Sequence, residues 1–444
     1  MITVHSVCNR CILVLFLATI LAPLPSRAEE FITIGHPACL SGRYAEPGLQ
    51  AHAGIRACIE WINEEYGGVK VKGKKMKLDY LYRDCRSEKE QVSRIMDRLI
   101  SRHKVEVIFA PYSSELSWRG LPQAESRGVL YMVHGGADDA MFHFGFKYAV
   151  QTIGPASLYH HNVLEMVHGL DPEATDIALI HEDSDFARRV RAGTVQKAQA
   201  LGMKIVSNKI YPSGCRSLLP LVKPLQELQP DLILGGGHYR DGVLLCRHLA
   251  ELDLRPGVIS IIASATLPDF QKDLGPLAQG IMGPSQWELD AHYSAEKARK
   301  KDIEWFGPSK EKFLELFQKA AAVTSKPGYH AAEAGAQVLA YVLAVERAGS
   351  LEPKRVRAAL GDLRFMSFYG VWDINTFGLQ EGHSMLEIQW QNGKREIVWP
   401  PEARTAEPLY PKPPFRAESD REASDLQTEA NSTASPAQGA KDAK

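Results

Sequence analysis

Two adjacent serines lie where an anion could bind. Ser113 and Ser114 belong to the segment PYSSE (residues 111–115), which follows a short apolar stretch and stands where a helix is expected to begin. The first backbone N–H groups of a helix have no partner within the helix, so they can bind a carboxylate or a phosphate. Serine is also a favoured helix N-cap. The pair therefore either caps the helix alone or caps it and also contacts a ligand.

Three other loops combine glycines with polar side chains. In HPACLSGRYAEPG (residues 36–48), Ser41 and Tyr44 offer hydroxyl groups. In HGGADD (134–139), Asp138 either contacts a ligand or caps a turn. GGGHYRDG (235–242) lacks the third glycine of a dinucleotide fingerprint and the Lys-Ser/Thr of a P-loop. A nucleotide site is therefore not expected.

Signatures of catalysis and metal binding are weak. The sequence has neither a Gly-x-Ser-x-Gly elbow nor a His-Glu-x-x-His helix. His330 and Glu333 are three residues apart and could face the same way, but zinc needs three or four ligands. We expect packed histidines here, no metal, no cofactor and no enzymatic activity, with an exported hydrolase as a remote alternative.

Strand-like and helix-like segments alternate along the chain and must position these loops. We expect strands at residues 31–35, 76–83, 105–110, 129–133, 176–181, 204–211, 231–234, 258–263, 370–373 and 385–391. We expect helices at residues 47–66, after a Ser87–Glu90 capping box, and at 185–201, 217–228, 240–252, 310–322 and 331–348. This order predicts an α/β fold with two doubly wound parallel sheets. Such sheets bind ligands beyond the carboxyl ends of their strands, so the polar loops should face a cleft between two lobes.

Composition excludes several classes of protein. Lys and Arg number 52 and Asp and Glu 53, for a net charge of −1. This balance argues against a nucleic-acid partner, which requires clustered positive charge. The 7 cysteines are too few for a disulfide scaffold. Cys39 and Cys85 end neighbouring strand loops, however, and a disulfide between them is geometrically reasonable.

The two ends of the chain are expected to lie outside the fold. Residues 1–28 contain Arg10, an apolar run and a small-residue cleavage pattern at residues 26–28. These features predict a secretory signal peptide cleaved after about Ala28, and therefore an exported, periplasmic protein without a stable membrane anchor. Residues 416–444 contain one large apolar residue, Leu426, and are predicted to form a disordered tail.

The sequence resembles type I periplasmic solute-binding proteins of ABC transporters, in the branched-chain amino acid group. The resemblance is carried by the order and spacing of many segments rather than by any one of them. They are SGRYA (41–45), AHAGIRACIEWINEEYGGV (51–69), YRDCRSEKE (82–90), PYSSE, GGADD, GGHYRDG, PGYHAAEAGA (327–336), RAGSLEPKRVRAAL (347–360) and FYGVWDINTFG (368–378).

The resemblance implies two lobes, joined by three hinge crossovers, that close on a small ligand. It implies a first lobe of residues 29–149 and 287–367 and a second of residues 150–286 and 368–415. It also implies delivery to the permease subunits of an ABC transporter in the inner membrane. A ligand-sensing receptor module of the same fold is the alternative.

The resemblance also implies which residues contact the ligand. Ser113 or Ser114 would hold a carboxylate, with help from the backbone of Gly136 and Ala137. Phe186 would form an aromatic wall, and His238 or Tyr239 would replace a tyrosine of the second lobe. With Tyr44, Tyr112, Asp138 and Ser264, the expected ligand-binding set is Tyr44, Tyr112, Ser113, Ser114, Gly136, Ala137, Asp138, Phe186, His238, Tyr239 and Ser264.

Three departures bear on the ligand. Asp138 replaces a hydroxyl-bearing residue, no acid lies near Ser264, and Tyr112 stands where some members have a cysteine that pairs with one like Cys85. A ligand other than leucine or a close relative is therefore expected. The candidates are another amino acid, an amide or a related carboxylate, with Asp138 binding an ammonium, amide or cationic group.

Overall fold

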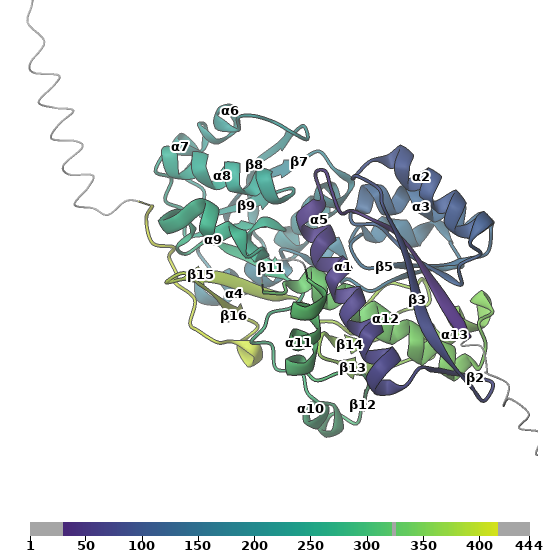
Figure 1. The fold of residues 1–444 in the computed structure, drawn as a ribbon. Helices are drawn as coiled ribbons and strands as arrows, with labels where there is room; N and C mark the ends of the chain where they lie inside the picture. The colour runs from purple at the N-terminus through teal and green to yellow at the C-terminus, as the bar shows by residue number, and fades with distance from the viewer. Residues whose placement is uncertain (1–29, 322–325, 416–444) are drawn as a thin grey trace, which may run out of the picture.

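The computed structural model describes residues 30–321 and 326–415 and contains two large sheets (Figure 1). The predicted signal peptide and tail lie outside these residues. The first sheet has the strand order β2-β3-β1-β4-β5-β6, parallel except for β2. Its strands are β1 (Phe31–Ala38), β2 (Val69–Val71), β3 (Lys74–Asp84), β4 (Val107–Phe109), β5 (Leu130–Val133) and β6 (Ala149–Gln151). We call the part of the molecule built on this sheet the first lobe.

The second sheet forms the second lobe and has the order β16-β15-β11-β10-β9-β7-β8. Its strands are β7 (Asp176–Glu182), β8 (Lys204–Tyr211), β9 (Leu232–Gly236), β10 (Val258–Ile261), β11 (Met282–Ser285), β15 (Leu386–Gln391) and β16 (Lys394–Trp399). Strand β15 runs antiparallel to both of its neighbours, β11 and β16. Every residue of β4 and β9 is buried, as expected of parallel strands covered on both faces. A small third sheet contains β12 (Glu304–Trp305), β13 (Phe365–Ser367) and β14 (Gly370–Trp372).

Helices pack around both sheets. They are α1 (Ala45–Glu60), α2 (Lys89–Asp97), α3 (Ser114–Ser126), α4 (His161–Leu170), α5 (Asp185–Ala200), α6 (Leu219–Val222), α7 (Leu225–Leu228), α8 (Tyr239–Glu251), α9 (Asp269–Leu274), α10 (Ala295–Lys300), α11 (Lys310–Ala320), α12 (Tyr329–Ala348) and α13 (Pro353–Asp362). Shorter helical turns are η1 (Trp61–Tyr66), η2 (Arg98–Arg102), η3 (Asp139–Phe144), η4 (Ala156–Leu158), η5 (Ser264–Thr266), η6 (Gly275–Ala278) and η7 (Pro401–Ala403). Within residues 30–321 and 326–415, no helix combines the length and apolar character needed to cross a membrane.

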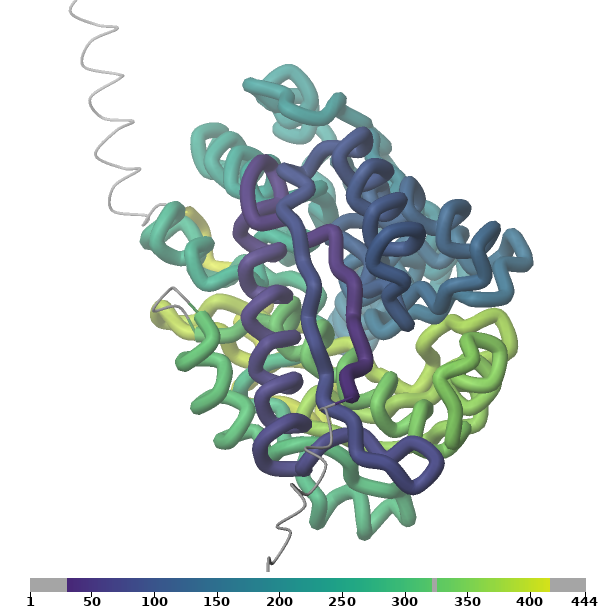
Figure 2. Tube along the Cα trace, turned by 45° about the vertical axis from the view of Figure 1, so that its right-hand side comes forward, coloured from purple at the N-terminus to yellow at the C-terminus, as the bar shows by residue number. Residues whose placement is uncertain are grey.

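The close packing of α1 on α12 fixes one wall of the site. Figure 2 shows α1 running beside strands β1 and β3, and α12, from the distant C-terminal half of the chain, packs against its other side. A Cβ atom on Gly54 would lie 2.0 Å from the carbonyl oxygen of Ala331, so only glycine permits this approach. Residues Tyr329 to Val345 of α12 are all buried. The helix is thus a central element, and its N-terminal residues, Tyr329 and His330, are held rigidly.

The predicted α/β class, with two doubly wound lobes, is confirmed, and most expected elements are present. The predicted helix at 217–228 is instead two short helices, because Pro224 separates α6 from α7. The Ser87–Glu90 capping box is wrong. Ser87 has a φ of 59°, and its hydroxyl donates to the carbonyl oxygen of Ser41 at 2.8 Å. The sequence analysis did not predict β2, β6, β11, β12, β13 or β16, and the precise lobe boundaries stay predictions.

Candidate functional site

A small cavity lies between the two lobes at the carboxyl ends of their strands. Its volume is about 10 Å³, about the space that one water molecule occupies, so the two lobes meet closely here and a ligand has to enter while they are apart. Its lining residues come from loops and helix starts in both lobes. They are Tyr112, Ser113, Ser114, Gly135, Ala137, Ile153, Tyr159, Phe186, His238, Tyr329 and His330.

The N-terminus of α3 supplies hydrogen-bond donors to this cavity. Ser113 is its N-cap and has an extended backbone, but its side chain makes no capping hydrogen bond. The Ser113 hydroxyl is buried and forms no close hydrogen bond, with the Tyr44 hydroxyl as a polar neighbour. Ser114 Oγ accepts a hydrogen bond from the Asp138 N–H at 3.1 Å. The free N–H groups of the first helical turn and the Ser113 hydroxyl together form a site suited to a carboxylate.

Two other helices begin at the same cavity. α8 has His238 as its N-cap, and α12 begins at Tyr329, next to His330. Each helix N-terminus carries a partial positive charge. At α8 this charge is opposed by the Asp241 carboxylate of the first turn and by the Glu182 carboxylate, 3.8 Å from His238 Nε2. The starts of α3 and α12 therefore favour a ligand with one negative charge.

Aromatic rings form most of the cavity wall. The Tyr159 and Phe186 rings meet edge to face with centroids 5.1 Å apart, and the Tyr112 and His330 rings do so at 5.0 Å. Phe186 lies 6.0 Å from His238. Burial lowers the pKa of His238 to about 4 and holds the pKa of His330 well below its usual value. Both imidazoles are therefore neutral near pH 7, and the wall is an uncharged aromatic surface.

The Asp138 carboxylate has its partners outside the cavity. Asp138 Oδ2 accepts from the Trp118 indole N–H at 2.8 Å, and its Oδ1 accepts from the Ala140 N–H at 3.0 Å. Arg189 Nε lies 3.3 Å from the same Oδ1. Asp138 is absent from the lining residues, so the prediction that its carboxylate is available for a ligand ammonium is at odds with this geometry.

A second ion pair closes the other part of the interface between the lobes. Arg43, in the loop after β1, contacts the carboxylate of Glu182 at the end of β7. The same guanidinium lies 3.2 Å from Asp241 Oδ2 of α8. The Glu182 side chain is completely buried. The lobes are therefore closed on each other, with both interlobe ion pairs formed.

The structure brings together most of the residues expected from sequence. Tyr112, Ser113, Ser114, Ala137, Phe186 and His238 line the cavity. Tyr44 lies behind this wall, with its ring centroid 4.9 Å from that of His238.

Three other expected residues lie outside the lining. Gly135 lines the cavity in place of Gly136. Tyr239 points outward, and its hydroxyl donates to Asp273 Oδ2 at 2.7 Å. Ser264 is buried beneath α8, where its hydroxyl donates to the carbonyl oxygen of His238 at 2.9 Å. Their direct contact with a ligand is therefore unsupported by the structure.

Three lining aromatic residues were missed by the sequence reasoning. Tyr159 follows η4, and Tyr329 and His330 begin α12. His330 was interpreted as a packed histidine, and it is indeed 1% exposed, yet its ring also lines the cavity. The segment PGYHAAEAGA was the sequence signal for Tyr329 and His330, because its small residues allow α12 to begin beside the cavity. In the described part of the chain, no cluster of three or more His, Cys, Asp or Glu side chains could hold a metal ion.

The sulfur atoms of Cys39 and Cys85 lie 3.3 Å apart, and both residues are free cysteines here. This separation exceeds a disulfide bond length of about 2.05 Å. The Cys39 thiol also lies 2.9 Å from the carbonyl oxygen of Tyr112, directly behind the cavity wall. The disulfide stays a prediction for the exported protein.

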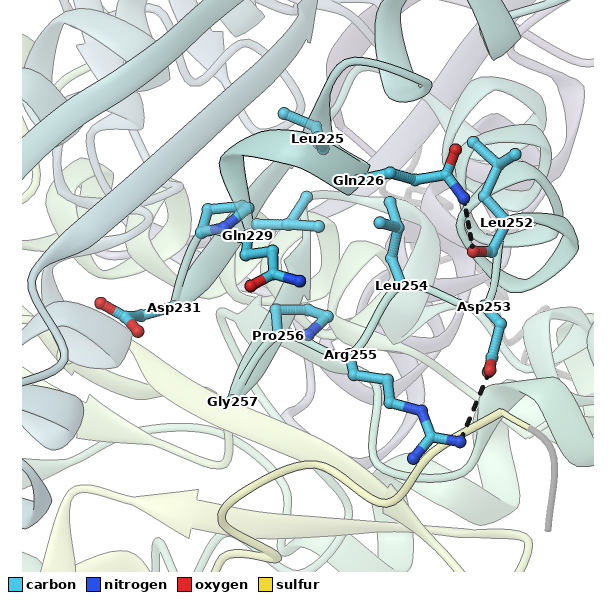
Figure 3. Close-up of a pocket in the computed structure, with 12 residues that line it drawn as sticks. Leu225, Gln226, Gln229, Asp231, Leu252, Asp253, Leu254, Arg255, Pro256 and Gly257 are labelled. Carbon is cyan, nitrogen blue, oxygen red and sulfur yellow. Dashed lines mark hydrogen bonds and ion pairs between the residues drawn. The ribbon is translucent and has the colours of Figure 1, made fainter. Parts of the chain in front are cut away.

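Larger hollows lie outside the cavity, and two of them bear on where a ligand could bind. One opens beside it, with His238 lining both, and contains Arg43, Tyr239 and Asp241. The other lies at the amino ends of β9 and β10 (Figure 3). There Gln226 donates to the Leu252 carbonyl oxygen at 3.3 Å, and Arg255 lies 3.5 Å from Asp253. This is the end of the sheet opposite to where doubly wound folds bind ligands.

Comparison with known proteins agrees with this architecture. The family model described as "Periplasmic binding protein" matches residues 32–394. Leu/Ile/Val-binding protein homolog 8 of Brucella abortus is 24% identical over 386 residues, covering 84% of this chain and 91% of that protein. A leucine binding protein of Thermotoga maritima has a TM-score of 0.70 at 18% identity, covering 82% of this chain and 97% of the other.

A second solved structure has the same fold and a different ligand. This is a solute binding protein of an ABC transporter from R. palustris in complex with 4-hydroxybenzoate, with a TM-score of 0.70 at 19% identity, covering 86% of this chain and 98% of the other. The family match, the two closed lobes and the cavity between them lead to one conclusion. The chain belongs to the periplasmic binding protein family, in the branched-chain amino acid group of the type I solute-binding proteins of ABC transporters.

Proposed function

We propose that this protein is the periplasmic substrate-binding component of an ABC importer and that it captures a small aromatic carboxylate by closure of its two lobes. The observation that carries this proposal is a cavity with uncharged aromatic walls. The start of α3, with the buried Ser113 hydroxyl, forms part of its wall. The proposed ligand contacts are Tyr112, Ser113, Ser114, Ala137, Phe186 and His238, with Tyr159, Tyr329 and His330 added.

The charge of the lining favours a plain carboxylate over an amino acid. An α-ammonium group requires an acceptor and a countercharge, because burying it unpaired costs several kcal/mol or shifts its pKa. Among the described residues that line the cavity there is no Asp or Glu, and Asp138 is paired with Trp118 and Arg189. A monoanion without an ammonium group matches the free N–H groups at the start of α3 and introduces no unpaired positive charge.

The shape and chemistry of the walls favour a flat ring as the ligand body. Aromatic side chains prefer stacked or edge-to-face neighbours, each such pair contributing about 0.5–1.5 kcal/mol beyond burial. The Brucella relative is named as a homologue of a Leu/Ile/Val-binding protein, whereas a structural neighbour from R. palustris was solved with 4-hydroxybenzoate. The aromatic lining supports the second ligand class for this chain.

A role in import follows from capture by closure. A ligand that touches Ser113 of the first lobe and Phe186 of the second stabilises the closed state by its differential affinity. A transporter can then distinguish the loaded protein from the open one. Export with cleavage near Ala28 would place it in the periplasm beside its permease.

Isothermal titration calorimetry of residues 29–444 with benzoate, hydroxybenzoates, leucine and benzamide tests the ligand class. Aromatic carboxylates should bind, and leucine and benzamide should bind far more weakly. Tighter binding of leucine than of every benzoate would contradict the proposal. Stimulation of ATP hydrolysis by the reconstituted permease complex, only with ligand present, would test the import role against a sensing role.

Ser113→Ala tests the carboxylate site. The variant should weaken benzoate binding by about tenfold, because a hydrogen bond to a charged group contributes about 1.5–3 kcal/mol. Ser126→Ala, at the exposed far end of the same helix, is the matched control and should leave affinity unchanged. Equal affinity in both variants would place the carboxylate elsewhere.

A further inference from the structure

His330, which lines the ligand cavity, has a buried ring nitrogen without a hydrogen-bond partner. Its Nδ1 lies 3.2 Å from Glu333 Oε1, one turn later in α12. Its Nε2 is buried and has no hydrogen-bond partner, although the residue lines the cavity and is 1% exposed. One ring nitrogen is therefore fixed by the protein, and the other is left for something in the cavity.

No neighbouring side chain satisfies Nε2. The Tyr112 and Tyr329 rings pack against the imidazole with centroids 5.0 and 3.9 Å away, and these are ring contacts. His134 and His238 are close enough to influence its charge, but neither forms a hydrogen bond with it. Leaving a polar group unpaired in such surroundings is costly, which points to a polar group on the ligand.

On the basis of the proposed function, we infer that the ligand is a hydroxy-substituted aromatic carboxylate. His330, oriented by Glu333, binds its ring hydroxyl. The carboxylate binds at the start of α3, and the hydroxyl hydrogen bonds to His330 Nε2. His330 is thus a specificity-determining residue that separates hydroxybenzoates from benzoate.

A hydroxyl matches this nitrogen better than a charged group does. Burial keeps the His330 imidazole neutral and raises the pKa of Glu333 well above its usual value, so the pair offers no charge to balance a second carboxylate. Depending on the tautomer, Nε2 either donates or accepts, and a hydroxyl can serve in either case because it is both donor and acceptor. A methyl group or a halogen could not satisfy it.

Calorimetry with three ligands, benzoate, 3-hydroxybenzoate and 4-hydroxybenzoate, tests the inference in the full mature chain. The better hydroxybenzoate should bind at least tenfold more tightly than benzoate, because sites built to hydrogen bond a hydroxyl reject analogues that lack it by large factors. His330→Phe keeps a flat ring without the nitrogen. It should reduce this preference to within about twofold, whatever change it makes to the affinity for benzoate itself.

Two further variants separate a structural effect from recognition. His181→Phe removes a histidine whose nitrogens are also buried and unpartnered, but which is absent from the cavity lining; it should keep the hydroxyl preference. Glu333→Leu should reduce the preference by releasing the imidazole, with retained benzoate binding as the check on folding. Equal binding of all three ligands by the wild type, or an unchanged preference in His330→Phe, would overturn the inference and leave the proposed function standing. Failure of every benzoate to bind would overturn both.

Discussion

Arg189 of α5 and Asp138 of the loop after β5 form an ion pair between the lobes, with 3.3 Å from Nε to Oδ1. Asp138 is buried and also accepts a hydrogen bond from Trp118. A carboxylate that seemed suited to a ligand ammonium therefore contacts the opposite lobe instead. Its expected role is to stabilise the closed state.

Substitution of this pair should weaken ligand binding indirectly. Arg189→Gln and Asp138→Asn should each reduce affinity several-fold, because they remove an attraction that exists when the lobes meet. Arg189 is one-third exposed, so the coupling should be only about 0.5–1 kcal/mol. A double-mutant cycle by calorimetry measures it, and strictly additive effects would show that the pair does not contribute to closure.

The Arg43 contact with Glu182 should contribute more to closure. With the lobes closed, Glu182 is buried beside Asp241 and Arg43 supplies the countercharge to both. Arg43→Gln should therefore lower ligand affinity by at least tenfold, since removing one partner of a buried charge pair is strongly unfavourable. Calorimetry provides the affinity, and Arg102→Gln, at the exposed end of η2, is the control.

The buried carboxyl of Glu387 should make the stability of the second lobe fall as pH rises from acidic to neutral. Glu387 in β15 is fully buried, accepts a hydrogen bond from Ser260 at 2.7 Å, and has its pKa raised by burial from 4.5 to about 8. Between these values the folded chain retains a proton that the unfolded chain has released. Stability therefore falls as pH rises through this window.

Glu387→Gln should remove this dependence. Relative to the wild type, the free energy of unfolding of the variant should rise by about 1 kcal/mol or more between pH 5 and pH 8. Urea denaturation at the two pH values measures the difference. Glu402→Gln, at an exposed position in η7, should change stability equally at both, and a similarly pH-independent effect for Glu387→Gln would contradict the assignment.

Cys39 and Cys85 should be joined in the exported protein, because their sulfur atoms lie 3.3 Å apart and the periplasm is oxidising. Alkylation of the denatured, unreduced mature chain, followed by mass spectrometry, should label Cys58, Cys215 and Cys246 but not this pair. Labelling at all five positions would show that the two remain thiols. A Cys39→Ala variant should expose Cys85 to the reagent.

The sequence by itself determined the alternation of strands and helices, the fold class and the loops that face the cleft. These features depend on local periodicity and turn chemistry, which are written in short segments such as PYSSE. The alternation of apolar strands with amphipathic helices specifies a parallel sheet with little reference to distant residues. Ser113 could be found because it stands where a helix begins after an apolar strand, whereas Phe186 was expected only from the resemblance to a known family.

Only the tertiary structure decided which of the polar groups remain free for a ligand. Asp138 and Tyr239 have the right position along the chain, but Arg189, Trp118 and Asp273 engage them. His330 joins the cavity because glycine at position 54 lets α12 approach α1 across a gap of nearly 280 residues in sequence. Such pairings depend on distance in space, and no pattern within one segment contains that information.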